Sequence, residues 1–137
     1  MAVGVVVVAH CDLAKEFVRA LRLIVPESRV IHSISLDPTE KLDSMRKKIL
    51  SGIGEADESD GVLILTDMFG GTPSNVALSF HEEHHVEVVT GMNLPMLVKL
   101  ASLGEDKSLE ELATFIKEYG QRNISVASQL LPEGNAG

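Results

Sequence analysis

The chain has 137 residues, 45% of them hydrophobic and 23% charged, which is typical of one soluble globular domain. This composition excludes a disordered chain, a collagen-like repeat and a small disulfide scaffold. The net charge of −8 repels nucleic-acid phosphates and anionic lipids, so we expect no nucleic acid, no direct membrane insertion and a protein partner with a basic face.

The N-terminal residues and the cysteine content indicate the compartment. The apolar run over residues 2–9 is shorter than the roughly 20 residues that span a bilayer, and no Lys or Arg precedes it as in a secretory signal. Cys11 is the single cysteine and cannot form an internal disulfide, which favours a reducing cytoplasm. We therefore expect a cytoplasmic protein that begins with a buried strand.

The first half of the chain alternates strand and helix patterns. The valine-rich run over residues 3–9 predicts a strand covered on both faces. Apolar residues at helical spacing predict a helix over residues 13–25, which Pro26 stops. Apolar residues that alternate with polar ones predict an edge strand over residues 30–36. A charged amphipathic pattern predicts a helix over about residues 40–51.

A second unit of the same kind follows a polar loop over residues 52–60. The apolar run over residues 61–66 predicts another buried strand, which ends before an acidic residue. After a glycine turn, Thr72 is expected to be the N-cap and Pro73 the first residue of a helix that continues to about residue 83.

The last third of the chain predicts one strand over residues 86–90, a helix over 95–100 and an amphipathic helix over 109–119. Residues 121–131 are compatible with a helix or a short strand. Residues 132–137 are expected to form a frayed tail after a single domain over residues 1–131.

Strands that alternate with helices predict a doubly wound α/β fold. We expect a four-stranded, mainly parallel sheet in the order 2-1-3-4, with helices on both faces. In such a sheet a ligand binds at the carboxyl ends of the strands, where the strand order reverses. That position lies between the first and third predicted strands.

The first and third strands end at His10 and Asp67. Because neighbouring strands are about 4.8 Å apart, the imidazole and the carboxylate are expected to form a hydrogen bond. A carboxylate on one ring nitrogen fixes the tautomer and leaves the other nitrogen as a nucleophile. His10 and Asp67 are therefore the predicted catalytic residues.

The surroundings of this pair favour an anion. Gly70, Gly71 and Thr72 form a glycine turn into a helix N-terminus, whose N–H groups are predicted to bind phosphate oxygens. The sequence has no Walker lysine, GxGxxG fingerprint or Asp-rich metal cluster, so we predict no cofactor and no metal. These features favour a histidine that itself accepts a phosphoryl group.

Simpler structural roles stay open for the same residues. His10 can be a structural hydrogen-bonding residue, Asp67 can cap a turn, and the two glycines can be a tight connection. A second histidine group near the end of a predicted helix suits a solvated face better than a metal site: His81, His84 and His85. A catalytic thiol at Cys11, beside a helix N-terminus, is a minor alternative.

Three stretches resemble one known family. These are residues 5–10 (Val-Val-Val-Val-Ala-His), residues 66–75 (Thr-Asp-Met-Phe-Gly-Gly-Thr-Pro-Ser-Asn) and residues 91–97 (Gly-Met-Asn-Leu-Pro-Met-Leu). They resemble the IIA component of the mannose-family phosphoenolpyruvate:sugar phosphotransferase system (PTS). The resemblance covers about residues 1–125, and the middle pattern, paired with an N-terminal histidine, is quite specific.

The resemblance implies a phosphocarrier of this system. His10 would be phosphorylated by HPr and discharged to a IIB component, with Asp67 on the other ring nitrogen so that transfer occurs at Nε2. Thr72 and the N–H groups around Gly71 would hold the phosphoryl oxygens. Members of the family are homodimers that exchange a C-terminal strand, which would give residues 121–131 a role.

The sequence departs from the family pattern in two places. Cys11 stands where glycine is common, and the chain ends at Gly137 without an Ala/Pro-rich linker or IIB domain, so a separate IIB protein is expected. Two alternatives remain: the phosphotransferase subunit of a dihydroxyacetone kinase, and a non-catalytic receiver-like binding module. The sequence also leaves open whether the role is in sugar transport or in regulation, because the chemistry of His10 is the same in both.

Overall fold

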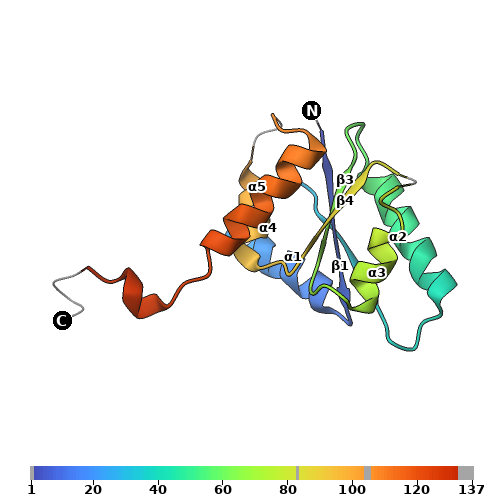
Figure 1. Cartoon of the computed structure of the whole chain (residues 1–137), viewed down its shortest axis with the longest axis horizontal. Coiled ribbons are helices and arrows are strands. Elements are labelled where there is room, and N and C mark those ends of the chain that lie inside the picture. Colours follow the sequence, from blue (N-terminus) through green and yellow to red (C-terminus); the bar gives the residue numbers. More distant parts are fainter. Residues whose placement is uncertain (1, 83, 104–105, 133–137) are drawn as a thin grey trace.

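The computed structural model describes residues 2–82, 84–103 and 106–132. Its four strands are parallel and form one sheet in the order β2-β1-β3-β4, which confirms the predicted fold class (Figure 1). The strands are β1 (Gly4–His10), β2 (His32–Leu36), β3 (Val62–Thr66) and β4 (Val86–Thr90). β2 is thus an edge strand, as expected, although it begins two residues later than the sequence pattern indicated.

Helices cover both faces of the sheet, as predicted. The helices are α1 (Leu13–Ile24), α2 (Leu42–Ala56), α3 (Thr72–Leu78), α4 (Leu94–Ser102) and α5 (Leu109–Arg122). α1, α4 and α5 pack on one face, while α2 and α3 pack on the other (Figure 1). Within the described residues, no helix combines the length and the apolar character needed to cross a membrane.

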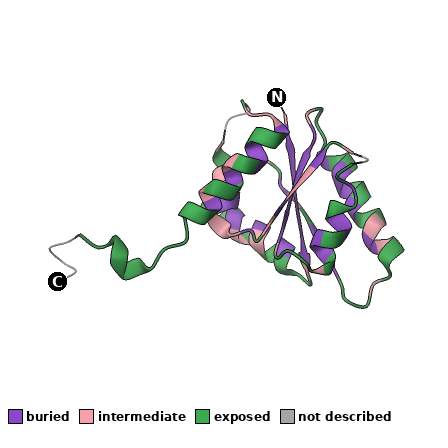
Figure 2. Cartoon of the chain, viewed as in Figure 1, coloured by how far each residue is buried: buried purple, intermediate pink, exposed green. Residues whose placement is uncertain are grey.

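The central strands are buried from both sides. Val5 and Val7 of β1 join the core under α1, α4 and α5, whereas Val6 and Val8 join the core under α2 and α3. This alternation explains why a run of valines, rather than an apolar–polar pattern, encodes β1. Figure 2 shows the result as a buried sheet between two half-exposed helical layers.

The prediction of a loop from residue 52 onward is wrong, because α2 continues to Ala56. Gly52 is buried in the helix, and a Cβ there would lie 2.5 Å from Ile34 Cδ1, so the residue allows α2 to approach β2 closely. Ile53 and Ala56 are also buried, which stabilises the additional turn by apolar packing.

The predicted start and end of α3 need correction as well. Gly71, in an extended conformation, is the N-cap, and Thr72 is already the first helical residue. The helix ends at Leu78 rather than near residue 83, a position outside the described residues. At this end the Ser79 hydroxyl donates to the Val76 carbonyl at 2.6 Å, a local bond that competes with continued helix.

The C-terminal residues differ from both alternatives considered for residues 121–131. α5 continues to Arg122, after which residues 123–132 leave the globular body and contain one 3-10 turn, η1 (Ala127–Leu130) (Figure 1). We call residues 123–132 the C-terminal arm. No residue of the arm belongs to a strand in this chain, and all of its residues are exposed. Residues 133–137 of the expected tail lie outside the described part.

Candidate active site

The carboxyl ends of β1 and β3 bring His10 and Asp67 into direct contact. The two strands are paired with Val8 opposite Thr66, so both chains leave the sheet at the same edge. His10 Nδ1 lies 2.7 Å from Asp67 Oδ2, and the same oxygen accepts the His10 backbone N–H at 3.0 Å. One carboxylate oxygen therefore orients both the backbone and the ring of His10.

The charge state of Asp67 follows from these contacts. Partial burial raises the pKa of its carboxyl, but hydrogen bonds from the His10 ring and the His10 backbone outweigh this effect, and the net pKa is lowered. Because an ionised carboxylate only accepts hydrogen bonds, the neutral His10 ring carries its proton on Nδ1 and its lone pair on Nε2. The His10 side chain is 43% exposed, so a reactant has access to the ring.

The glycine turn lies against the His10 ring. A Cβ on Gly71 would be 2.8 Å from His10 Cε1 and 3.3 Å from Nε2, so any larger residue here would push the ring aside. Gly70 has φ of 85°, a conformation that side chains disfavour. These two glycines allow the backbone of the turn to lie close to His10 Nε2.

Ser74 completes this turn and was missed in the sequence analysis. The Ser74 hydroxyl accepts the Gly70 N–H at 3.0 Å and donates to the Gly71 carbonyl at 3.1 Å, and the residue is only 2% exposed. Ser74 lies three residues after the N-cap, where side chains often hydrogen-bond back to the preceding loop. This position is the sequence signal that could have indicated its role. Thr72 is exposed at the start of α3. Phosphate binding by Gly70, Gly71 and Thr72 stays a prediction.

Cys11 follows His10 directly and is exposed. Its φ of 51° is in the left-handed region, which glycine adopts most readily. The backbone therefore explains why glycine suits this position, and a cysteine there adds local strain. Its backbone N–H donates to the Leu36 carbonyl at 3.0 Å, which connects the site to the end of β2.

The three histidines near the end of α3 do not converge. His81 Nδ1 lies 2.7 Å from the Val86 carbonyl, His84 packs against Phe80, and His85 Nε2 lies 3.5 Å from Glu110 Oε1. Within the described parts of the chain, no three His, Cys, Asp or Glu side chains are arranged to hold a metal ion.

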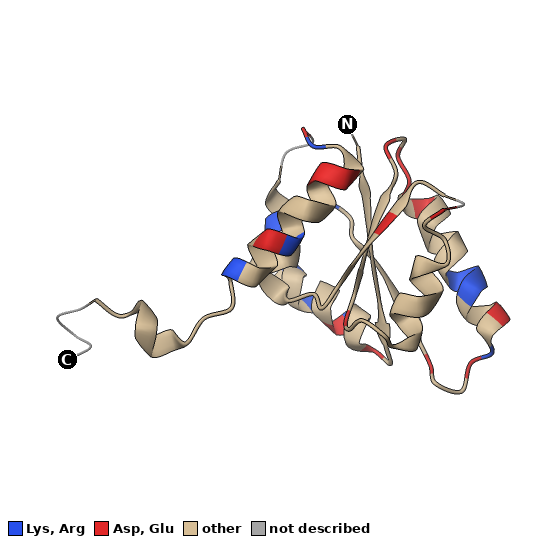
Figure 3. Cartoon of the chain, in the orientation of Figure 1, with Lys and Arg blue, Asp and Glu red and all other residues tan. Residues whose placement is uncertain are grey.

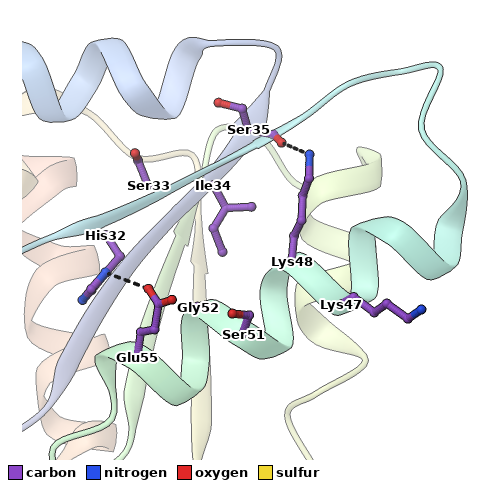
Figure 4. A pocket seen from close by; sticks show the side chains of 9 residues that line it. All are labelled: His32, Ser33, Ile34, Ser35, Lys47, Lys48, Ser51, Gly52 and Glu55. Atoms are coloured by element: carbon purple, nitrogen blue, oxygen red, sulfur yellow. Dashed lines mark hydrogen bonds and ion pairs between the residues drawn. The ribbon is translucent and has the colours of Figure 1, made fainter.

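A groove of about 570 Å³ lies between the edge strand β2 and helix α2, away from His10 (Figure 4). Lys48 crosses it to the Ser35 carbonyl at 3.2 Å and also pairs with Glu40 at 2.8 Å. His32 Nδ1 lies 3.7 Å from a carboxylate oxygen of Glu55. Lys48 and Glu40 therefore compensate one another, while Lys47 also lines the groove.

Comparison with known proteins gives consistent matches. The sequence profile of the EIIA-man family, described as the PTS system fructose IIA component, matches residues 4–117. A sorbose-specific EIIA component of Lacticaseibacillus casei is 34% identical over 125 residues, which cover 88% of this chain and 90% of that protein. The mannose-specific EIIAB component of Escherichia coli K12 is 29% identical over 126 residues.

The length of the match differs among relatives. It covers 90% of this chain but only 39% of the E. coli EIIAB component, so this chain spans about two fifths of that relative. The mannose/sorbose-specific IIA subunit from Enterococcus faecalis has a solved structure that superposes with a TM-score of 0.85 and 28% identity. That superposition covers 97% of this chain and 98% of the other. The chain therefore belongs to the mannose family of PTS EIIA components, which are phosphotransferase proteins.

Proposed function

We propose that His10 of this phosphocarrier accepts a phosphoryl group from phospho-HPr and passes it to a IIB component, in sugar uptake or in PTS-based regulation. The observation that carries this proposal is the 2.7 Å contact between His10 Nδ1 and Asp67. It leaves Nε2 as the nucleophile, on a side chain that is 43% exposed.

In the loading step, the Nε2 lone pair attacks phosphorus while the bond from phosphorus to its donor atom on HPr breaks. The donor atom keeps the bonding electrons, and no proton has to leave Nδ1. The phosphorylated imidazole then carries positive charge, which the ionised Asp67 stabilises. Discharge to the IIB component is the same exchange in reverse, with a IIB atom as nucleophile.

The phosphoryl oxygens need hydrogen-bond donors beside Nε2. We assign this role to the turn at Gly71 and Thr72, because Gly71 backbone lies against the His10 ring and the first amides of a helix have no intrahelical partner. Gly70 belongs to the same turn, but its N–H already donates to Ser74. Gly70 therefore contributes to phosphate binding through the backbone conformation of the turn, not through its own N–H group.

The surface around the site supports a protein partner. Met68 and Phe69 follow Asp67 and are 55% and 73% exposed, so an apolar patch adjoins the reactive ring. Figure 3 shows acidic residues near the start of α1 and in the loop between β2 and α2, at the same end of the sheet. An apolar centre with acidic surroundings suits a protein partner with a basic face.

We also propose that the protein is a cytoplasmic homodimer in which the C-terminal arm adds a strand to the partner. The arm exposes four large apolar side chains: Ile124, Val126, Leu130 and Leu131. A groove of about 520 Å³ lies between the edge strand β4 and helix α5 of the same chain. Together they offer an exposed apolar segment and a sheet edge that a second copy can pair.

The proposed chemistry can be tested by incubation with phosphoenolpyruvate, enzyme I and HPr, followed by mass spectrometry. The protein should gain a single acid-labile phosphate, and His10→Ala should gain none while keeping its unfolding temperature. His32→Ala is the matched control, since it removes a half-buried histidine that also lies near a carboxylate, and it should be phosphorylated normally. Phosphate uptake by His10→Ala would disprove the assignment.

A further inference from the structure

We propose that Ser74 is a positioning residue for phosphoryl transfer: its hydroxyl holds the Gly70–Gly71 turn against the His10 ring. This inference rests on the proposed role of His10. It gives a function to a buried polar side chain whose hydrogen bonds go to the turn and not to the ring. Ser74 is 2% exposed and bonds both glycines.

The two hydrogen bonds of Ser74 connect the start of α3 back to the turn. Its oxygen accepts the Gly70 N–H, and its proton goes to the Gly71 carbonyl, which also accepts the Asn75 N–H at 3.1 Å. Two consecutive glycines have more conformational freedom than any other pair of residues. A hydroxyl that bonds on both sides of the Gly70–Gly71 peptide restricts this freedom.

The restriction matters because Gly71 lies directly beside the nucleophile. The space for a Cβ on Gly71 is limited by His10 Cε1 at 2.8 Å and Nε2 at 3.3 Å. A shift of the turn by about one ångström would change the distance from its amides to a phosphoryl group on Nε2, and misplacements of this size can slow a reaction strongly. Donors act on a transition state mainly when they are already in position.

Ser74 also determines which amides are available. Because the Gly70 N–H is already donated to Ser74 Oγ, we assign the donors for the phosphoryl group to the Gly71 and Thr72 N–H groups of the same turn. Pro73 has no N–H, so it leaves no competing donor between Thr72 and Ser74. The turn therefore presents two adjacent amides rather than three.

The test compares Ser74→Ala with Ser79→Ala in steady-state transfer from phospho-HPr. Ser79 is the matched control, because its hydroxyl also bonds a backbone carbonyl of α3, that of Val76, but at the other end of the helix. Ser74→Ala should lower kcat roughly tenfold with KM for HPr nearly unchanged, less than the 10²–10³-fold loss of a direct donor. Ser79→Ala should leave both constants within twofold.

A second readout separates positioning from a general loss of stability. In ³¹P NMR, the phosphohistidine signal of Ser74→Ala should shift from that of the parent, whereas the signal of Ser79→Ala should not. Equal kcat for the two variants, or an unshifted signal in Ser74→Ala, would overturn the inference while leaving the role of His10 intact. A parent protein that takes up no phosphate in the same assay would instead refute the proposed function.

Discussion

At the scale of single residues, Asp67 orients His10, because one of its carboxylate oxygens is hydrogen-bonded to both the backbone N–H and the ring of His10. Asp67→Asn keeps the shape but removes the charge, and its amide can present a donor to Nδ1 and favour the wrong tautomer. A hydrogen bond to a charged group contributes roughly 1.5–3 kcal/mol, and about 1.4 kcal/mol corresponds to tenfold in rate. We expect transfer from HPr to slow by about ten- to a hundredfold.

Stopped-flow measurement of phosphoryl transfer checks this prediction. Asp12→Asn is the control, since it removes an acidic charge near the site from an exposed residue whose side chain caps no helix. It should transfer phosphate at nearly the parental rate. If Asp67→Asn also stays within twofold of the parent, Asp67 only shapes the turn and takes no part in the transfer.

At this scale, the sequence could predict only the part of the site that the strand order alone brings together. The ends of β1 and β3 meet in any sheet of this order, so His10 and Asp67 could be paired from the sequence. The position of Ser74 after the glycine turn was a hint, but the sequence does not show whether its hydroxyl faces solvent or the preceding loop. Its contacts depend on where the backbone of Gly70 and Gly71 turns.

At the scale of elements, glycines set how closely α2 approaches the sheet. Gly4 of β1 lies against the end of α2, where a Cβ would be 2.1 Å from the Ala56 carbonyl oxygen. Backbone cannot move aside as a side chain can, so Gly4→Ala should lower the free energy of unfolding by about 1–3 kcal/mol or more. Urea denaturation measures this loss.

Gly54 of α2 differs from Gly4, because it has room for a side chain. It is exposed, and a Cβ there would meet nothing within 4 Å. Gly54→Ala should therefore raise the free energy of unfolding by roughly 0.5–1 kcal/mol, because alanine loses less conformational entropy in a helix. If both substitutions shift the urea midpoint in the same direction, close packing of β1 on α2 does not explain the role of Gly4.

The same packing explains which elements the sequence could predict. Strands β1 and β3 were recognised because they are apolar on both faces. The end of α2 was not recognised, because residues 52–60 were interpreted as a polar loop, whereas Gly52 is the residue that lets α2 rest on Ile34. Glycine occurs in loops and at close helix–strand contacts alike, and only the neighbouring strand distinguishes the two.

At the scale of the whole molecule, α5 ends in a fixed position from which the C-terminal arm departs. The Asn93 side chain caps α4 through the Met96 N–H and also donates to the Gly120 carbonyl at 3.0 Å. A Cβ on Gly120 would lie 2.4 Å from Met96 Sδ, so the last turns of α5 pack tightly on α4. The packed part of the described chain therefore ends with α5 at Arg122. The sequence could not place the arm, because its proposed partner is another chain.

Removal of residues 123–137 should convert the proposed dimer into a folded monomer. Ile124 and Leu130 of the arm are 75% and 72% exposed in the single chain, which is costly for large apolar side chains unless a second copy covers them. Sedimentation at micromolar concentration should give a dimer for the full chain and a monomer after truncation. Removal of residues 133–137 alone is the control, and it should leave the dimer intact because these four apolar side chains remain: Ile124, Val126, Leu130 and Leu131. A full chain that sediments as a monomer would reject the dimer, and a truncated chain that stays dimeric would show that the copies associate through another surface.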